Sequence, residues 1–278
     1  MGFGTLALSG LMQQDLLAKK SPLYPRTPHF APKAQSVIFL YMDGGVSQVD
    51  SFDPKPQLAK ENGQPPRFQV DATVFNKNGN LLKSPWEFKR YGESGIPISD
   101  LFPNIGSCAD DICIIRSMTA FSPNHPNANY ALHSGHVLSG RPSMGAWASY
   151  GLGTLSQDLP SYVVIHGGQV PSGGMQCFGS GFLPANHQGS IFLSSNPALN
   201  NTSHQETTAA IQKRKLEFLH EMDGEFEARL SHAEAIESAI LNYELAYRMQ
   251  MEVPDVTDLS KESEATKKLY GIDAPYKN

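Results

Sequence analysis

The sequence is poor in several features that would otherwise define a class of protein. Its 278 residues contain three cysteines and two tryptophans, and 18% of them are charged. Cys108, Cys113 and Cys177 lack the paired spacing of a structural metal site, and they allow one disulfide at most. The cysteines therefore do not identify a redox compartment.

A basic surface and a long apolar run are also missing. The net charge is −5 and no block of Lys or Arg occurs, which argues against a nucleic-acid surface and gives no reason to expect an anionic membrane as a partner. The apolar run Gly2–Met12 is too short to span a bilayer, so we expect no stable membrane insertion.

The same run resembles the apolar part of a secretory signal, although a basic segment before it and a clear cleavage site are missing. A simple N-terminal helix is the alternative. We expect an exported protein, periplasmic or extracellular, in which residues 1–33 form a signal remnant and a Pro-rich lead-in. Ser21–Lys33, with four prolines, is predicted to be an extended linker.

Two apolar runs predict buried strands of a mostly parallel sheet. Val37–Met42 is the first run and ends in Asp43-Gly44-Gly45, and Ile112–Ile115 is the second, after a predicted helix. Ligands of open α/β sheets bind where such strands end. Asp43 is therefore a candidate metal ligand and the two glycines let a substrate approach the backbone, whereas the alternative is that Asp43 only starts a turn.

A polar loop follows the second predicted strand. Within it lie Ser122, Asn124 and His125, and the chain then enters a predicted helix that carries His133 and His136. If the two predicted strands pair, their ends place Asp43 beside His125. Histidine together with a carboxylate is an ordinary catalytic or zinc-binding combination. Asn-His-Pro-Asn is equally typical of a turn, with the later histidines capping a helix or facing solvent.

The rest of the chain predicts structure more than chemistry. Residues 142–153 predict a helix with a glycine cap, and 162–165 predict a buried strand. A long glycine-rich loop follows, in which His187 is a candidate for substrate binding. Two capping boxes, Ser203–Glu206 and Ser231–Glu234, each precede an amphipathic helix, so a helical hairpin is expected.

Three stretches resemble the DUF1501 family, which is similar to sulfatases of the alkaline-phosphatase superfamily. They are SVIFLYMDGGVSQVDSFDPKP, DLFPNIGSCADDICIIRSM and SPNHPNANYALHSGHVLSGRPSMGAWASYGLG. The resemblance implies an α/β sandwich of alkaline-phosphatase type with a mostly parallel sheet. It also implies a divalent metal (zinc, calcium or magnesium), with Asp43 as a ligand.

The nucleophile that the resemblance implies is not found. The sulfatase motif C/S-x-P-S-R is missing, so formylglycine chemistry is not expected. By the sulfatase spacing, His125 takes the nucleophile's place, beside Asn124. Ser122 stands before Pro-Asn-His much as a threonine does in phosphodiesterase relatives, one residue out of register.

The later metal-binding signatures of the superfamily do not follow within the sequence, so the resemblance implies a sandwich truncated after its first half, over residues 34–278. We expect a metal-dependent hydrolase of sulfate or phosphate esters, acting on a small-molecule or glycan ester. The alternatives are a non-catalytic binder of sulfated or phosphorylated glycans and an inactive gene fragment.

Overall fold

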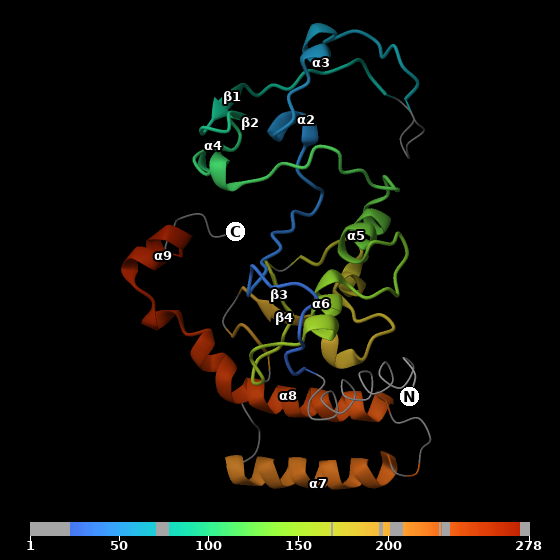
Figure 1. Ribbon diagram of the computed structural model, residues 1–278, viewed down its shortest axis with the longest axis vertical. Helices are drawn as coiled ribbons and strands as arrows, with labels where there is room; N and C mark the ends of the chain where they lie inside the picture. The colour runs from blue at the N-terminus through green and yellow to red at the C-terminus, as the bar shows by residue number, and fades with distance from the viewer. Residues whose placement is uncertain are drawn as a thin grey trace, which may run out of the picture. The chain divides into compact units, whose positions relative to one another are not determined.

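The computed structural model describes residues 23–70, 78–167, 169–194, 197–200, 208–227, 229 and 234–272. The chain divides into two compact units (Figure 1). Unit 1 comprises Met1–Gln35 and Asn124–Asn278, and unit 2 comprises Ser36–Pro123. The signal-like run Gly2–Met12 and the first capping box lie outside the described residues, as does most of the second box.

Unit 2 is built around a short antiparallel hairpin. Its elements in chain order are α2 (Gln48–Ser51), α3 (Pro56–Lys60), β1 (Phe88–Tyr91), β2 (Ile96–Ser99), α4 (Pro103–Gly106) and the 3₁₀ turn η1 (Ala109–Asp111). Ile98 and Ser99 of β2 are fully buried, and the Ser99 hydroxyl donates to the Asp50 carbonyl over 2.5 Å. This bond fixes β2 to the end of α2.

The two strands expected in this unit do not form. Residues 36–42 and 112–115 have no strand assignment, and Val37, Ile38 and Leu40 are more than 80% exposed. A strand is stable only when its backbone groups are paired, and in the described part of unit 2 neither segment has a neighbouring strand. The prediction of two buried strands is therefore wrong for these residues, because an apolar pattern does not supply a pairing partner.

Unit 1 contains the longer helices. Its elements are α5 (His125–Ser134), α6 (Met144–Leu152), β3 (Val163–His166), η2 (Gly174–Phe178), η3 (Ala185–His187), β4 (Ser190–Leu193), α7 (Ala209–Glu227), α8 (Glu234–Val256), η4 (Leu259–Lys261) and α9 (Glu264–Tyr270). The predicted helix at 142–153 is confirmed and ends at Gly153, which has a φ of +70°. A strand forms at the predicted position 162–165, but it is not buried throughout, because Val163 and Ile165 are 42% and 73% exposed.

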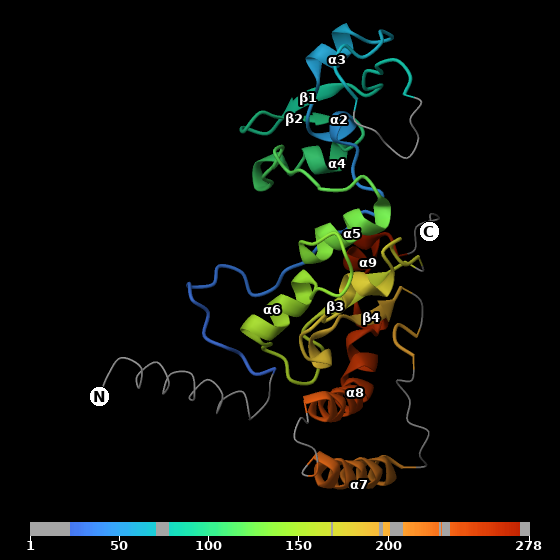
Figure 2. The same cartoon turned by 90° about the vertical axis from the view of Figure 1, so that its right-hand side faces the viewer.

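The core of unit 1 lies on both faces of a parallel strand pair. Strands β3 and β4 pair in register from Val163 opposite Ser190. Successive residues of a strand point to opposite faces. Accordingly Ile191 packs on the cluster that contains Val164 and Phe178, whereas Phe192 packs on the buried face of α8. Helix α8 lies below the β3–β4 pair in both views (Figure 2).

The lead-in is not an isolated linker. Leu23 is 3% exposed, and its carbonyl accepts a bond from the Thr154 backbone N–H over 2.9 Å. The Arg26 N–H donates to the Leu152 carbonyl over the same distance. The four prolines predict an extended backbone for the lead-in. The backbone hydrogen bonds show that the first described residues of the lead-in pack on the end of α6.

The expected helical hairpin is present as α7 and α8. The Gln212 amide donates to Gln250 over 2.6 Å, and His220 Nδ1 lies 3.9 Å from a Glu244 carboxylate oxygen. These contacts join one face of α7 to α8 along much of its length. None of the described helices has the length and apolar character required to cross a bilayer.

Candidate functional site

Helix α5 begins at the polar loop that the sequence singled out. Asn124 occupies the N-cap position with an extended backbone, and Pro126 lies in the first turn, where its fixed φ suits a helix. The first helical bond runs from the Ala128 N–H to the Asn124 carbonyl over 2.8 Å. The helix ends at Gly135, which has a φ of +74°. The predicted helix start is therefore confirmed.

The first turn of α5 is supported from its side. The Asn127 amide donates to the Val137 carbonyl over 2.8 Å, which folds the segment after the helix back along it. His125 is exposed and Ser122 is half-buried. Asn124 and His125 belong to unit 1, whereas Ser122 belongs to unit 2, so the structure joins the first two on one helix end.

The later turns of α5 are buried on one side. Asn129 donates to the Ser172 hydroxyl over 2.8 Å, and the His133 ring packs edge-on against Phe178 with 5.2 Å between ring centres. Burial lowers the pKa of His133, because an imidazolium would lose its hydration there. His133 therefore serves the core of unit 1 and neither caps the helix nor faces solvent, while His136 lies beyond the helix end.

His187 lies in a second buried polar cluster. Its Nδ1 is 2.7 Å from the Ser149 hydroxyl, which in turn lies 2.6 Å from the Ser161 hydroxyl. Burial first, and the positive charge of Arg26 second, lower the pKa of His187 to about 4. The ring is therefore neutral at pH 7 and stacks edge-on against Tyr150.

Ser149 and His187 have the residue types of a nucleophile and its base. Both side chains are closed off from solvent, with exposed fractions of 3% and 1%, so a substrate could not reach the hydroxyl. The pair instead connects α6 to η3. The sequence did not indicate a role for Ser149, because a single serine in an apolar helix has no pattern that marks it as functional. That His187 binds substrate stays a prediction.

Asp43 lies in a tight turn of unit 2. The Gly45 N–H donates to the Met42 carbonyl over 3.0 Å, and both glycines have positive φ, +85° at Gly44 and +75° at Gly45. Type II turns require such a conformation at their third residue, which explains the glycine at position 44. The Asp43 carboxylate is exposed and accepts a bond from the Tyr41 hydroxyl over 3.0 Å.

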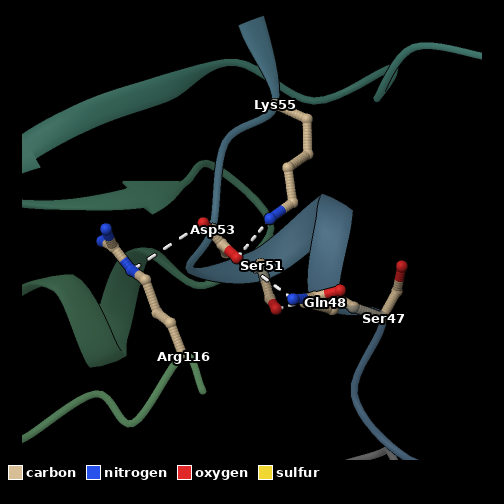
Figure 3. A network of polar contacts seen from close by, with 6 residues as sticks. All are labelled: Ser47, Gln48, Ser51, Asp53, Lys55 and Arg116. Carbon is tan, nitrogen blue, oxygen red and sulfur yellow. Dashed lines mark hydrogen bonds and ion pairs between the residues drawn. The ribbon is translucent and has the colours of Figure 1, made fainter. Parts of the chain in front are cut away.

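Nothing in the sequence indicated chemistry at Asp53, yet this carboxylate lies in a network of polar contacts in unit 2 (Figure 3). It accepts bonds from Lys55 over 2.5 Å and from Gln48 over 3.1 Å, and Arg116 lies 3.9 Å away. The Lys55 bond is the main cause of a lowered Asp53 pKa. The contacts connect the chain after residue 115 to the end of α2, which is a structural role.

Metal ligands do not gather in the described part of the chain. No group of three or more His, Cys, Asp or Glu side chains there is placed to hold a metal ion. Asp43 is a single exposed carboxylate, and one carboxylate is too few for a zinc, calcium or magnesium site. The donor set that the structure describes therefore does not fit such a site on its own.

Comparison with known proteins identifies the family. The family described as "Protein of unknown function (DUF1501)" matches residues 34–278. The chain belongs to the DUF1501 family. No curated protein and no solved structure matches it significantly. Within this DUF1501 protein, the match covers the turn at Asp43, all of α5 and the α7–α8 hairpin.

Proposed function

We propose that this DUF1501 protein is a metal-dependent hydrolase of sulfate or phosphate esters and that the N-terminal end of α5 is its reacting centre. The observation that carries the proposal is the position of His125. This exposed residue is the first residue of a ten-residue helix whose later turns are anchored in the core of unit 1. An imidazole is thereby held at a helix end that attracts anions.

The electrostatics of this end suit a sulfate or phosphate group. The first N–H groups of an α-helix have no partner within the helix, and the aligned peptide dipoles place a partial positive charge there. At α5 these groups are the N–H of His125 and of Asn127, since Pro126 has none. No side-chain capping bond is made at Asn124. The oxygens of a bound ester would be stabilised by these backbone groups.

His125 has two possible roles in ester cleavage. As a general acid, its imidazolium would protonate the leaving oxygen while that oxygen's bond to sulfur or phosphorus breaks. As a nucleophile, a ring nitrogen would form a bond to sulfur or phosphorus while the alcohol leaves, and water would then cleave the new bond. Both roles require the exposed ring that the structure shows at this position.

The metal belongs to the proposal through Asp43 and the resemblance to sulfatases. A bound divalent ion would supply charge stabilisation on the ester oxygens. No step above depends on the ion, because the described residues do not assemble a site for it. The two steps argued for His125 rest on α5 alone.

The test is turnover of nitrophenyl sulfate and nitrophenyl phosphate by the whole chain and by His125→Ala. We expect the variant to lose about 10²-fold or more in kcat/KM, as for removal of a general acid or nucleophile. Its melting temperature should stay close to that of the parent, because the side chain is exposed. His29→Ala, at another exposed histidine of unit 1, is the matched control and should keep full activity.

Activity retained in His125→Ala would contradict the proposal and move the chemistry elsewhere, with Ser122 the next residue to substitute. A parent chain that binds sulfated or phosphorylated glycans without any turnover would instead support the non-catalytic alternative. In that case His125→Ala should weaken binding of the glycan, since the same helix end would hold the anion.

A further inference from the structure

Helix α7 carries an apolar stripe on a face that its contacts with α8 do not cover. Ile211, Phe218, Met222 and Phe226 are separated by seven, four and four positions, so they share one face of the helix, on which Lys215 lies between Ile211 and Phe218. Their exposed fractions are 48%, 60%, 53% and 54%. Large apolar side chains gathered in this way mark an interaction surface more often than isolated ones do.

A different face of α7 is already occupied. Gln212 and His220, which contact α8, lie on that face, as does Leu216, which is half-buried. A groove of about 490 Å³ runs between the two helices and is lined partly by Leu216 and Leu219. Leu219 lies between the stripe and this groove, so the apolar surface continues from one into the other.

The charges of α7 are divided along its length. The early turns hold the basic residues Lys213, Arg214 and Lys215, and the acidic residues Glu217, Glu221, Asp223 and Glu225 follow them. Arg214, Glu221 and Glu225 fall on the same edge of the stripe by helical spacing. One edge of the apolar surface is therefore basic at its start and acidic at its end.

We propose that α7 pairs antiparallel with α7 of a second copy of this chain. Antiparallel packing about a two-fold axis places the basic half of each helix beside the acidic half of the other, and it buries both stripes. Arg214 of one copy would then face Glu225 of the other, and symmetry forms each such pair twice. Parallel packing would place like charges together.

The charge pattern also distinguishes this partner from a lipid surface. Amphipathic helices that bind membranes are rich in Lys and Arg beside the apolar face. Here Glu221 and Glu225 stand on the edge of the stripe, and anionic lipids would repel them. The surface complements itself better than it complements a membrane.

The first test is the mass of the whole chain by size-exclusion chromatography with light scattering. We expect a dimer, with twice the 30.4 kDa mass of one chain, and a monomer for F218E/M222E. Both replaced residues are more than half exposed, so the variant should keep the circular dichroism spectrum of the folded parent. Leu269→Glu, at an 81% exposed leucine of α9, is the matched control and should remain dimeric.

Charge reversal tests the orientation of the pair. R214E should weaken the dimer by about tenfold, because two attractive pairs become repulsive, and R214E/E225R should restore it. In a parallel pair Arg214 would lie beside the basic half of the partner helix, so R214E would relieve repulsion and strengthen the dimer, which would contradict the antiparallel arrangement.

Three other results would also overturn the proposal. The first is a parent chain that is monomeric at every concentration measured, and the second is a dimer that survives F218E/M222E. The third is a monomer that sediments with phosphatidylcholine–phosphatidylserine vesicles through the stripe, losing the interaction in F218E/M222E. This last result would assign the stripe to a lipid surface.

Discussion

At the scale of single residues, burial decides what each histidine of unit 1 can do. His125 is exposed at a helix start, whereas His187 is 1% exposed and bonded to Ser149. Both were candidates for the functional site because polar residues in loops suggest binding. Sequence does not distinguish an exposed imidazole from a buried one, because the neighbours of His187, Ser149 and Tyr150, both belong to α6 and are distant in the chain.

The buried state of His187 predicts a pH dependence of stability. The unfolded chain binds a proton at this ring with a pKa near 6.5, whereas in the folded chain its pKa is lowered to about 4. Between these values the unfolded state holds more protons, so stability falls as the pH is lowered from about 6.5 and the loss levels off below about 4. The full loss is about 3 kcal/mol for a shift of this size.

Chemical denaturation of the parent and of His187→Gln across this pH range measures the effect. The variant has no group that titrates at this position, so its stability should fall less steeply with decreasing pH. His29→Gln, at an exposed histidine, should keep the slope of the parent. Equal slopes for the parent and His187→Gln would show that the buried ring does not control acid stability.

At the scale of elements, the sequence predicted helices better than strands. The start of α5, the glycine end of α6 and the α7–α8 hairpin were all expected, because caps and helical periodicity are local signals. Strand β3 was also expected, and it forms because β4 pairs with it. Residues 37–42 have a similar apolar pattern but no described partner strand. The local sequence of a strand does not specify which other strand it pairs with.

The end of α6 offers a prediction about the lead-in. Gly153 has a φ of +70°, and a Cβ there would lie 2.1 Å from the Tyr24 carbonyl oxygen. Gly153→Ala should therefore cost about 2 kcal/mol or more in the free energy of unfolding, from backbone strain and from displacement of the residues packed on α6. Thermal and urea denaturation measure this loss.

Gly135→Ala is a matched control for that substitution. Gly135 ends α5 with a similar φ of +74°, but no atom lies within 4 Å of the Cβ position. Only the backbone cost applies, which is about 1 kcal/mol. If both variants lost the same free energy of unfolding, the close packing of residue 24 against α6 would make no contribution to stability.

At the scale of the whole molecule, the two units differ in how much of their structure the sequence indicated. The core of unit 1 includes the predicted elements β3 and α8, whereas β4 and η2 were not predicted. The fold of unit 2 depends on contacts that no sequence pattern predicted. The Asp110 carboxylate, for example, accepts the backbone N–H bonds of Glu93 and Ser94 and so fixes the β1–β2 hairpin. Such hydrogen bonds between a side chain and distant backbone groups can be recognised only in the folded structure.

The sequence predicted a candidate site made of two neighbouring strand ends, one with Asp43 and the other with Asn124 and His125. His125 and Asn124 lie together because consecutive residues of one helix start must do so. Asp43 belongs to unit 2 and was linked to them through the expectation of two adjacent buried strands. Since those strands do not form, the metal role of Asp43 now rests on its exposed carboxylate and on the resemblance to sulfatases.

The metal content of the purified chain tests that role. We expect the parent to retain a divalent ion after dialysis and Asp43→Ala to retain less, because the substitution removes a carboxylate oxygen and leaves the turn glycines in place. Asp111→Ala, at another exposed acidic residue of unit 2, is the control for a general loss of negative charge. Elemental analysis gives the metal-to-protein ratio of each. The same ratio in the parent and in Asp43→Ala would contradict a metal role for this carboxylate.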